Sequence, residues 1–193
     1  MIKEALVVLA LGVALLGCGT TRLIDADVST FGSWPAGRVP GSFTFERLPS
    51  QQAQAQQQQE LEAAALPALE QAGFKAVDSG GDALVQVASR SLRYERGPYD
   101  AGFYEPYWRG NASYLHRWRG VGFGWSLHAP YYVNEVSLLI RDSKTQQVVY
   151  EARAQSDGPW AEEGLMRALF EAALKDFPHT AVSPRRVSVE AQR

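Results

Sequence analysis

Two neighbouring stretches in the second half of the chain place apolar residues at every second position, and no other feature limits the possible folds as strongly. Residues 133–142 and 148–155 both follow this pattern, as Val136, Leu138 and Ile140 illustrate. A period of two predicts β-strands that bury one face. The short polar stretch between them predicts that they form a hairpin. The chain is therefore expected to build a sheet that is covered on one side only.

Residues 23–29 and 42–48 alternate in the same way, and 83–94 is predicted as a strand with Val85 and Val87 facing the core, which brings the predicted sheet to about five strands. A helical stretch separates the second of these strands from the third. A connection of this kind makes the two strands parallel if both belong to one sheet.

The first helix is predicted to begin at Ser50, whose hydroxyl suits an N-cap position. The Gln-rich residues 51–59 contain good helix formers, and Gly73 is a helix stop signal. Pro67 lies inside this pattern, where a proline removes one backbone hydrogen bond and costs about 3 kcal/mol. A kink or a break is therefore expected near Leu66.

The last helix is predicted to start near Asp157, which can cap it, and to end at Phe177-Pro178. Residues 179–193 are expected to form a flexible tail. The pattern as a whole predicts an α+β fold, a two-layer sandwich with a mixed, mostly antiparallel sheet of about five strands and two helices on one face. This single domain is expected to span residues 23–178.

The amino terminus looks like the export signal of a bacterial lipoprotein. A positively charged start precedes the apolar run 5–16, whose helical length of about 18 Å is too short for a bilayer core of roughly 30 Å. Gly17 and Cys18 follow this run and resemble a lipobox, in which a small residue precedes the cysteine. Residues 1–17 are therefore expected to be a cleaved signal peptide and residues 18–22 a lipidated linker.

Cys18 is the predicted attachment site of a diacylglyceryl group, which would anchor the chain in a membrane with the domain facing the periplasm. The alternative is that Cys18 is a bystander at the end of an ordinary signal peptide. The next residue is Gly19 rather than Asp, and by its resemblance to the sorting pattern of Gram-negative lipoproteins this favours the outer membrane. Because Cys18 is the only cysteine, no intrachain disulfide can form.

Charge and motifs argue against several classes of function. The formal net charge is −2, and the chain lacks the basic footprint of a nucleic-acid-binding protein. Its histidines are scattered, and it has no nucleophile elbow or phosphate loop, so we expect no metal, no cofactor and no catalytic residues. The enzymatic alternative is a cell-wall hydrolase or transferase that pairs His116 or His128 with Asp100 or Glu105.

Several segments together resemble one protein family. They are GSFTFERLPSQ at 41–51, ALEQAGFKAV at 68–77, DALVQVASRS at 82–91, VSLLIRDSKTQQVVYEARA at 136–154 and EAALKDFP at 171–178. In this order, and behind a lipobox, they resemble the bacterial envelope proteins of domain-of-unknown-function family 4136. The resemblance implies a periplasm-facing lipoprotein with a small α+β domain. It brings no known activity and no catalytic residues.

An insert at residues 96–132 is the most aromatic part of the chain, because more than half of all aromatic residues lie between Tyr94 and Tyr132. One interpretation is that these rings pack on the uncovered sheet face as core, in a purely structural protein. The other is a binding surface for peptidoglycan sugars, lipid head groups or another envelope protein. The rings of that surface would be those of Tyr104, Trp108, Trp118 and Trp125. Three arginines lie among them: Arg109, Arg117 and Arg119. They could bind a carboxylate or phosphate, or they could be ordinary solvated charges.

Overall fold

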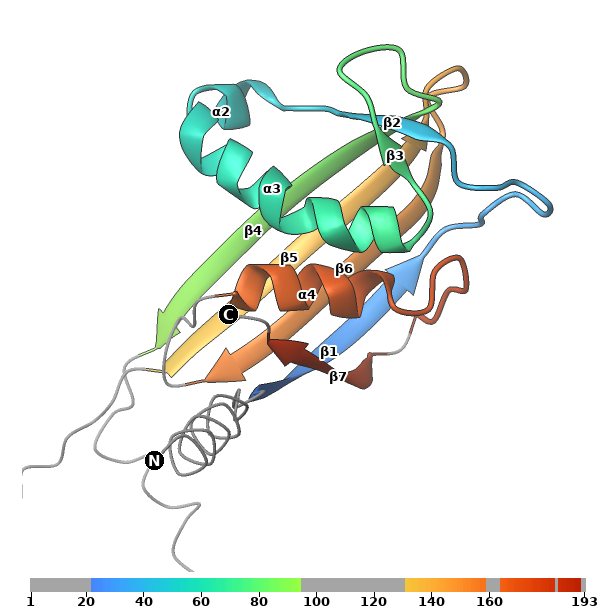
Figure 1. The fold of residues 1–193 in the computed structure, drawn as a ribbon. Coiled ribbons are helices and arrows are strands. Elements are labelled where there is room, and N and C mark those ends of the chain that lie inside the picture. Colours follow the sequence, from blue (N-terminus) through green and yellow to red (C-terminus); the bar gives the residue numbers. More distant parts are fainter. Residues whose placement is uncertain (1–21, 95–130, 159–163, 183, 192–193) are drawn as a thin grey trace, which may run out of the picture.

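The alternating stretches form a seven-stranded sheet in the computed structural model, which describes residues 22–94, 131–158, 164–182 and 184–191. The strands lie in the order β3-β2-β4-β5-β6-β1-β7 (Figure 1). Their bounds are Arg22–Phe31 for β1, Ser42–Phe45 for β2, Lys75–Ala76 for β3, Ala83–Tyr94 for β4, Tyr131–Asp142 for β5, Val148–Gly158 for β6 and Arg185–Ala191 for β7. The helices of the described residues are α2 (Pro49–Gln52), α3 (Ala55–Gln71) and α4 (Leu165–Leu174).

The sheet is mixed. β2 pairs in parallel with β3 and β4, and the other neighbouring strands pair antiparallel. The chain crosses from β2 to β4 through α2 and α3, and the expected parallel pairing of these two strands is confirmed. The α+β class is confirmed as well. The expected number of strands was too low, because β3 and β7 also join the sheet.

The prediction of a flexible tail at 179–193 is wrong where the chain forms β7. This strand pairs with β1 along its length, from Arg22↔Ala191 to Val28↔Arg185. Val187 is buried against the core, and the pairing supplies hydrogen bonds to a side of β1 that would otherwise be a free edge. In the tail only Val187 and Val189 alternate with polar residues, and this pattern is too short to predict a strand by itself.

The first helical region differs from its prediction at both of the positions singled out. Leu48, not Ser50, precedes the first turn, and its N–H donates to the Gln51 side chain at 2.8 Å. Of the kink or break expected near Leu66, the break is wrong, because α3 continues through Pro67. The turns around this proline are buried at Ala65, Ala68 and Leu69, and their packing outweighs the lost backbone hydrogen bond. Glu62 of α3 is buried as well, and its carboxylate accepts two hydrogen bonds from the Arg47 guanidinium at 2.7 and 2.6 Å.

The last helix begins later than predicted. Asp157 and Gly158 belong to β6, where they pair with Val133 and Tyr132 of β5. The helix α4 starts only after Gly164, a glycine with a positive φ of 78°. Continued pairing with β5 outweighs the capping preference of Asp157, so Gly164 and not Asp157 is the N-cap residue of α4.

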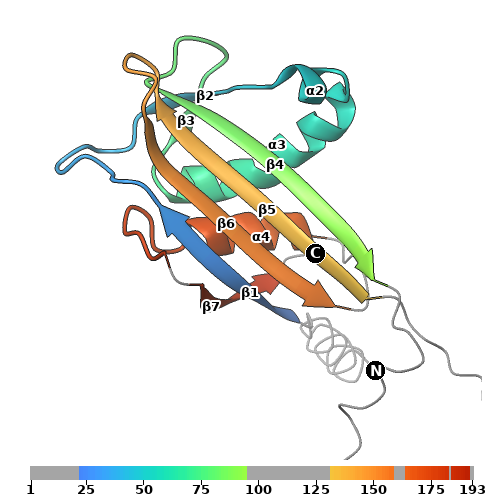
Figure 2. The same ribbon diagram turned by 180° about the vertical axis from the view of Figure 1, so that it is seen from behind.

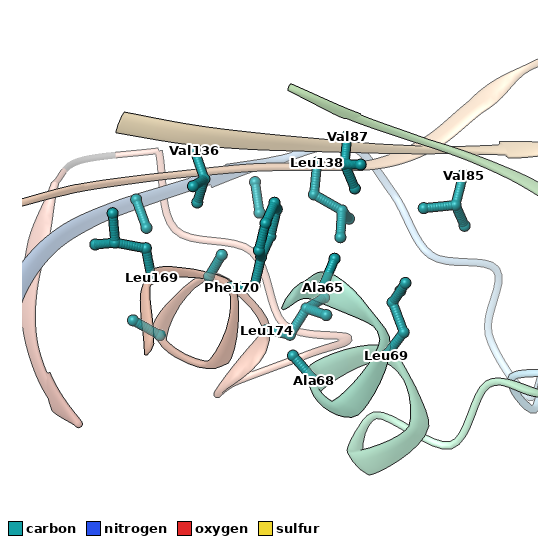
Figure 3. Close-up of a cluster of buried hydrophobic side chains, with 14 of the residues drawn as sticks. Ala65, Ala68, Leu69, Val85, Val87, Val136, Leu138, Leu169, Phe170 and Leu174 are labelled. Atoms are coloured by element: carbon teal, nitrogen blue, oxygen red, sulfur yellow. The ribbon is translucent and has the colours of Figure 1, made fainter. Parts of the chain in front are cut away.

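The core lies between the sheet and the two long helices. Val85, Val87, Val136 and Leu138 point from the strands toward side chains of α3 and α4 (Figure 3). Both helices lie on the same face of the sheet, and no helix of the described residues covers the other face (Figure 2). The two-layer arrangement with helices on one face is therefore confirmed, although the described residues form three helices rather than the expected two. The second face of β4, β5 and β6, which no described helix covers, is called the open face below.

Candidate binding surface

The residues singled out from sequence lie outside the described part of the chain. This holds for Gly17 and Cys18, for the rings of the insert, Tyr104, Trp108, Trp118 and Trp125, and for His116 and His128. The structure does show where their segments join the sheet. Tyr94 pairs with Tyr131, Tyr132 pairs with Gly158, and β1, which begins at Arg22, runs antiparallel to β6. The start of β1 and both ends of the insert therefore lie at one end of the sheet, the insert end (Figure 1).

The open face of the sheet contains a hollow of about 370 Å³. Its floor lies at the cross-strand pair of Ala88 on β4 and Ser137 on β5, whose short side chains leave space between longer neighbours. Gln86, Leu139 and the charged residues around the floor form the walls. The hollow exists because small residues are paired in the middle of a face that no described helix covers.

Charged side chains around this hollow alternate in sign. Arg90 and Glu135 face each other across β4 and β5, and Arg153 of β6 forms an ion pair with Glu151 at 2.8 Å. These two arginines and two glutamates sum to no net charge. The wall therefore offers both donors and charged acceptors, which suits a polar neutral or zwitterionic ligand better than an anion.

Another hollow, of about 210 Å³, lies at the opposite end of the sheet, next to the β5–β6 turn. Asp142 organises it: its carboxylate accepts hydrogen bonds from the backbone N–H groups of Lys144 and Thr145 at 3.0 and 2.8 Å and from the Arg38 guanidinium at 2.8 Å. The Arg38 guanidinium also lies over the Trp34 ring, 5.1 Å from its centroid. These contacts use the charges of the cluster to hold the turn and the loop after β1, so the cluster has a structural role.

The same hydrogen bonds, first of all that from the Thr145 backbone, lower the pKa of Asp142 from 3.8 to about 2. A lowered carboxyl pKa stabilises the fold fully above 3.8, and this contribution is lost as the pH falls toward 2. We expect the free energy of unfolding of the native protein to fall more steeply across this window than that of Asp142→Asn, which cannot titrate. Urea unfolding at both ends of the window measures the two slopes. Equal slopes would contradict this role of Asp142.

Metal and membrane-spanning features are absent from the residues that the structure describes. Among them, no three side chains of His, Cys, Asp or Glu gather as possible metal ligands. No helix in this part of the chain combines the length and the apolar character needed to cross a bilayer.

The residues around the hollow on the open face were only partly predicted from the sequence. The alternation of the hairpin placed Ser137, Glu151 and Arg153 on the polar side, and this is where they lie. Gln86 and Arg90 of β4 pair with residues of β5 on that same face, so the period of two could have predicted their side as well. The pairing of Ala88 with Ser137, which creates the hollow, depends on the register between β4 and β5. The sequence of one strand alone does not predict that register.

The fold and its open face define a class: a small α+β domain with helices on one side of a mixed sheet. The chain belongs to the family described as Domain of unknown function (DUF4136), whose model matches residues 27–179. This confirms the family resemblance seen in the sequence. No curated protein matches the chain.

Two solved structures are distantly similar. One is a PDZ domain protein from Parabacteroides distasonis ATCC 8503, with 14% identity and a TM-score of 0.48; the match covers 94% of this chain and 42% of that protein. The other is the PelC dodecamer from Paraburkholderia phytofirmans, with 13% identity and a TM-score of 0.43; the match covers 77% of this chain and 94% of that one. This chain thus spans less than half the length of the PDZ domain protein.

Proposed function

We propose that the chain is a lipid-anchored protein of the bacterial envelope, held at the outer membrane through Cys18, whose domain binds a protein or a cell-wall component in the periplasm without catalysing a reaction. The apolar run and the lipobox-like Gly17-Cys18 support the anchor. The polar open face supports binding rather than catalysis, because its charged groups are balanced and spread over three strands.

One observation carries the proposal furthest: the start of β1 and the two strand ends that flank the insert lie at the same end of the sheet. From Cys18 to Arg22 a fully extended chain spans at most about 14 Å. The insert end of the sheet would therefore stay close to the bilayer surface. Since the insert leaves at Tyr94 and returns at Tyr131, its rings would start from that same end. Tyr and Trp are suited to such a site, because they combine apolar area with a polar tip.

The anchor is tested by mass spectrometry of the protein isolated from its own cells. We expect a mature chain that begins at Cys18 and carries acyl chains, and we expect Cys18→Ser to move the protein from the membrane fraction to the soluble one. Several acyl chains at about 0.8 kcal/mol per buried CH₂ make this an all-or-none effect. An unmodified Cys18 thiol, or unchanged fractionation of Cys18→Ser, would rule the anchor out.

Binding is tested by crosslinking in intact cells and by sedimentation with purified peptidoglycan. We expect a variant with Trp108, Trp118 and Trp125 changed to Ala to lose its crosslinked partners or its sedimentation. The matched control changes Gln86 and Arg153 of the open face to Ala and separates the two surfaces. Partners that are unchanged in both variants would exclude both surfaces. Hydrolysis of a glycan panel by the native protein would instead support the enzymatic alternative.

A further inference from the structure

The middle of the open face is a regular grid in which β4, β5 and β6 each contribute one residue to every row. Neighbouring strands lie about 4.8 Å apart, and neighbouring rows about 7 Å apart. The hollow of about 370 Å³ has its floor at Ala88 and Ser137, in the middle row. The three rows are Gln86, Leu139 and Glu151; Ala88, Ser137 and Arg153; and Arg90, Glu135 and Gln155.

Some polar side chains around the hollow have no partner among the described residues. Glu151 and Arg153 form an ion pair with each other at 2.8 Å. By contrast, no hydrogen bond or ion pair within the described part of the chain engages the side chains of Gln86, Arg90 and Glu135. Glu135 is half-buried, so its carboxylate loses part of its contact with water and gains no donor in return. These groups are therefore available to a ligand that supplies the matching donors and acceptors.

Two of these unpartnered groups carry opposite charges and lie directly opposite each other, Arg90 on β4 and Glu135 on β5. Directly opposite residues of an antiparallel pair have Cβ atoms about 4.5–5.5 Å apart, yet no ion pair joins these two side chains. A guanidinium can donate two parallel hydrogen bonds to a carboxylate, and a carboxylate accepts from an ammonium group. The pair therefore matches a ligand that carries a carboxylate and an ammonium group on the same carbon atom.

We propose that Arg90 and Glu135 form a clamp for the head group of an α-amino acid, whose side chain lies in the hollow over Ala88. The ligand carboxylate binds Arg90, and the ligand ammonium group binds Glu135. Leu139 offers apolar contact to the ligand side chain, and the Gln86 amide offers a donor and an acceptor to a polar group at its end. Two rows separate Arg90 from Gln86, about 14 Å between Cα atoms, so the ligand chain between its head group and its polar end is several atoms long.

A ligand with only one kind of charge fits the hollow less well. An anion would meet the carboxylates of Glu135 and Glu151, and a cation would meet the guanidinium groups of Arg90 and Arg153. A head group with both charges places each one beside its opposite. A diamino acid that is built into a peptide through one end keeps such a head group at its other end, and peptides of the bacterial cell wall contain diamino acids. The choice of a cell-wall peptide as the natural ligand rests on the proposed function.

NMR titration of the full chain in detergent micelles tests the clamp, with both enantiomers of Nε-acetyl-lysine as probes. This compound has a free α-amino-acid head group and an amide at the end of an unbranched side chain. We expect the amide signals of Ala88, Glu135 and Ser137 to shift and to saturate with a millimolar Kd for at least one enantiomer. Acetylation of the α-amino group, or conversion of the carboxylate to an amide, should weaken binding about tenfold.

Three variants and one matched control separate the clamp from the rest of the face. Arg90→Gln and Glu135→Gln should each weaken binding of the probe about tenfold. Ala88→Leu fills the hollow and should abolish binding although both charges of the clamp remain. The control Glu190→Gln makes the same change as Glu135→Gln at an exposed position of β7, three strand positions from β5, and should bind like the native protein. The dispersed amide spectrum of each variant reports that it is folded.

Several outcomes would overturn the clamp. They are the absence of saturable shifts at tens of millimolar probe, equal binding of the blocked probes, and native-like binding by Arg90→Gln and Glu135→Gln. A protein crosslinked in cells that is lost in these two variants, without any binding of the probe, would assign the face to a protein partner instead. Because the probe is measured on purified protein whether or not Cys18 is acylated, failure of the anchor and failure of the clamp are told apart.

Discussion

Replacing Phe170 by alanine is expected to lower the free energy of unfolding by about 3–5 kcal/mol. The Phe170 ring extends from α4 toward the sheet, where it lies among the side chains of the core (Figure 3), and it is 0% exposed. Truncation loses the transfer free energy of the ring and leaves a cavity that a rigid sheet cannot close. Urea unfolding of the mature protein measures the change.

The matched control is Val182→Ala, a truncation at a side chain that is 66% exposed. It should change the free energy of unfolding by less than about 0.5 kcal/mol. The cost at Phe170 is expected to be high because α4 is short and most of its residues are buried, among them Leu169, Phe170 and Ala173. A loss below about 1 kcal/mol for Phe170→Ala would mean that α4 is not an essential part of the core.

The second large effect is expected from Gly81→Ala, with a loss of about 3 kcal/mol. A Cβ atom at Gly81 would lie 2.6 Å from the Phe43 carbonyl carbon and 2.7 Å from the Thr44 nitrogen, both in the backbone of β2. Backbone atoms cannot rotate away as a side chain can, so β2 must move. This movement would strain the hydrogen bond from the Gly81 N–H to Thr44 Oγ1, 3.1 Å long, and the parallel pairing of β2 with β4.

Gly158→Ala is the control for this substitution. No atom lies within 4 Å of a Cβ built at Gly158, and its backbone is not in the left-handed region. Alanine there should be neutral or slightly stabilising, because it restricts the unfolded chain. Thermal unfolding of both variants separates the steric cost at Gly81 from the general effect of replacing a glycine. Equal midpoints would contradict the close approach to β2.

Local patterns predicted the main elements because their physical cause is local. The apolar residues at every second position of 83–87 and 136–140 reflect one face that meets the helices, and β4 and β5 form there. The helix break predicted near Pro67 does not occur: the cost of a proline is local, whereas the packing that offsets it comes from the sheet beneath α3. Asp157 was likewise predicted to cap a helix, but it lies in β6 because it pairs with Val133 of β5.

The sequence by itself determined the α+β class, the family and the one-sided character of the sheet, since each follows from the order and periodicity of residues along the chain. Only the tertiary structure decided that β7 joins β1, that Ala88 meets Ser137 in the hollow, and that β2 pairs with β4 from Ala83 to Val85. The reason is that strand neighbours and register depend on contacts between segments far apart in sequence, and many partners satisfy the same alternation equally well.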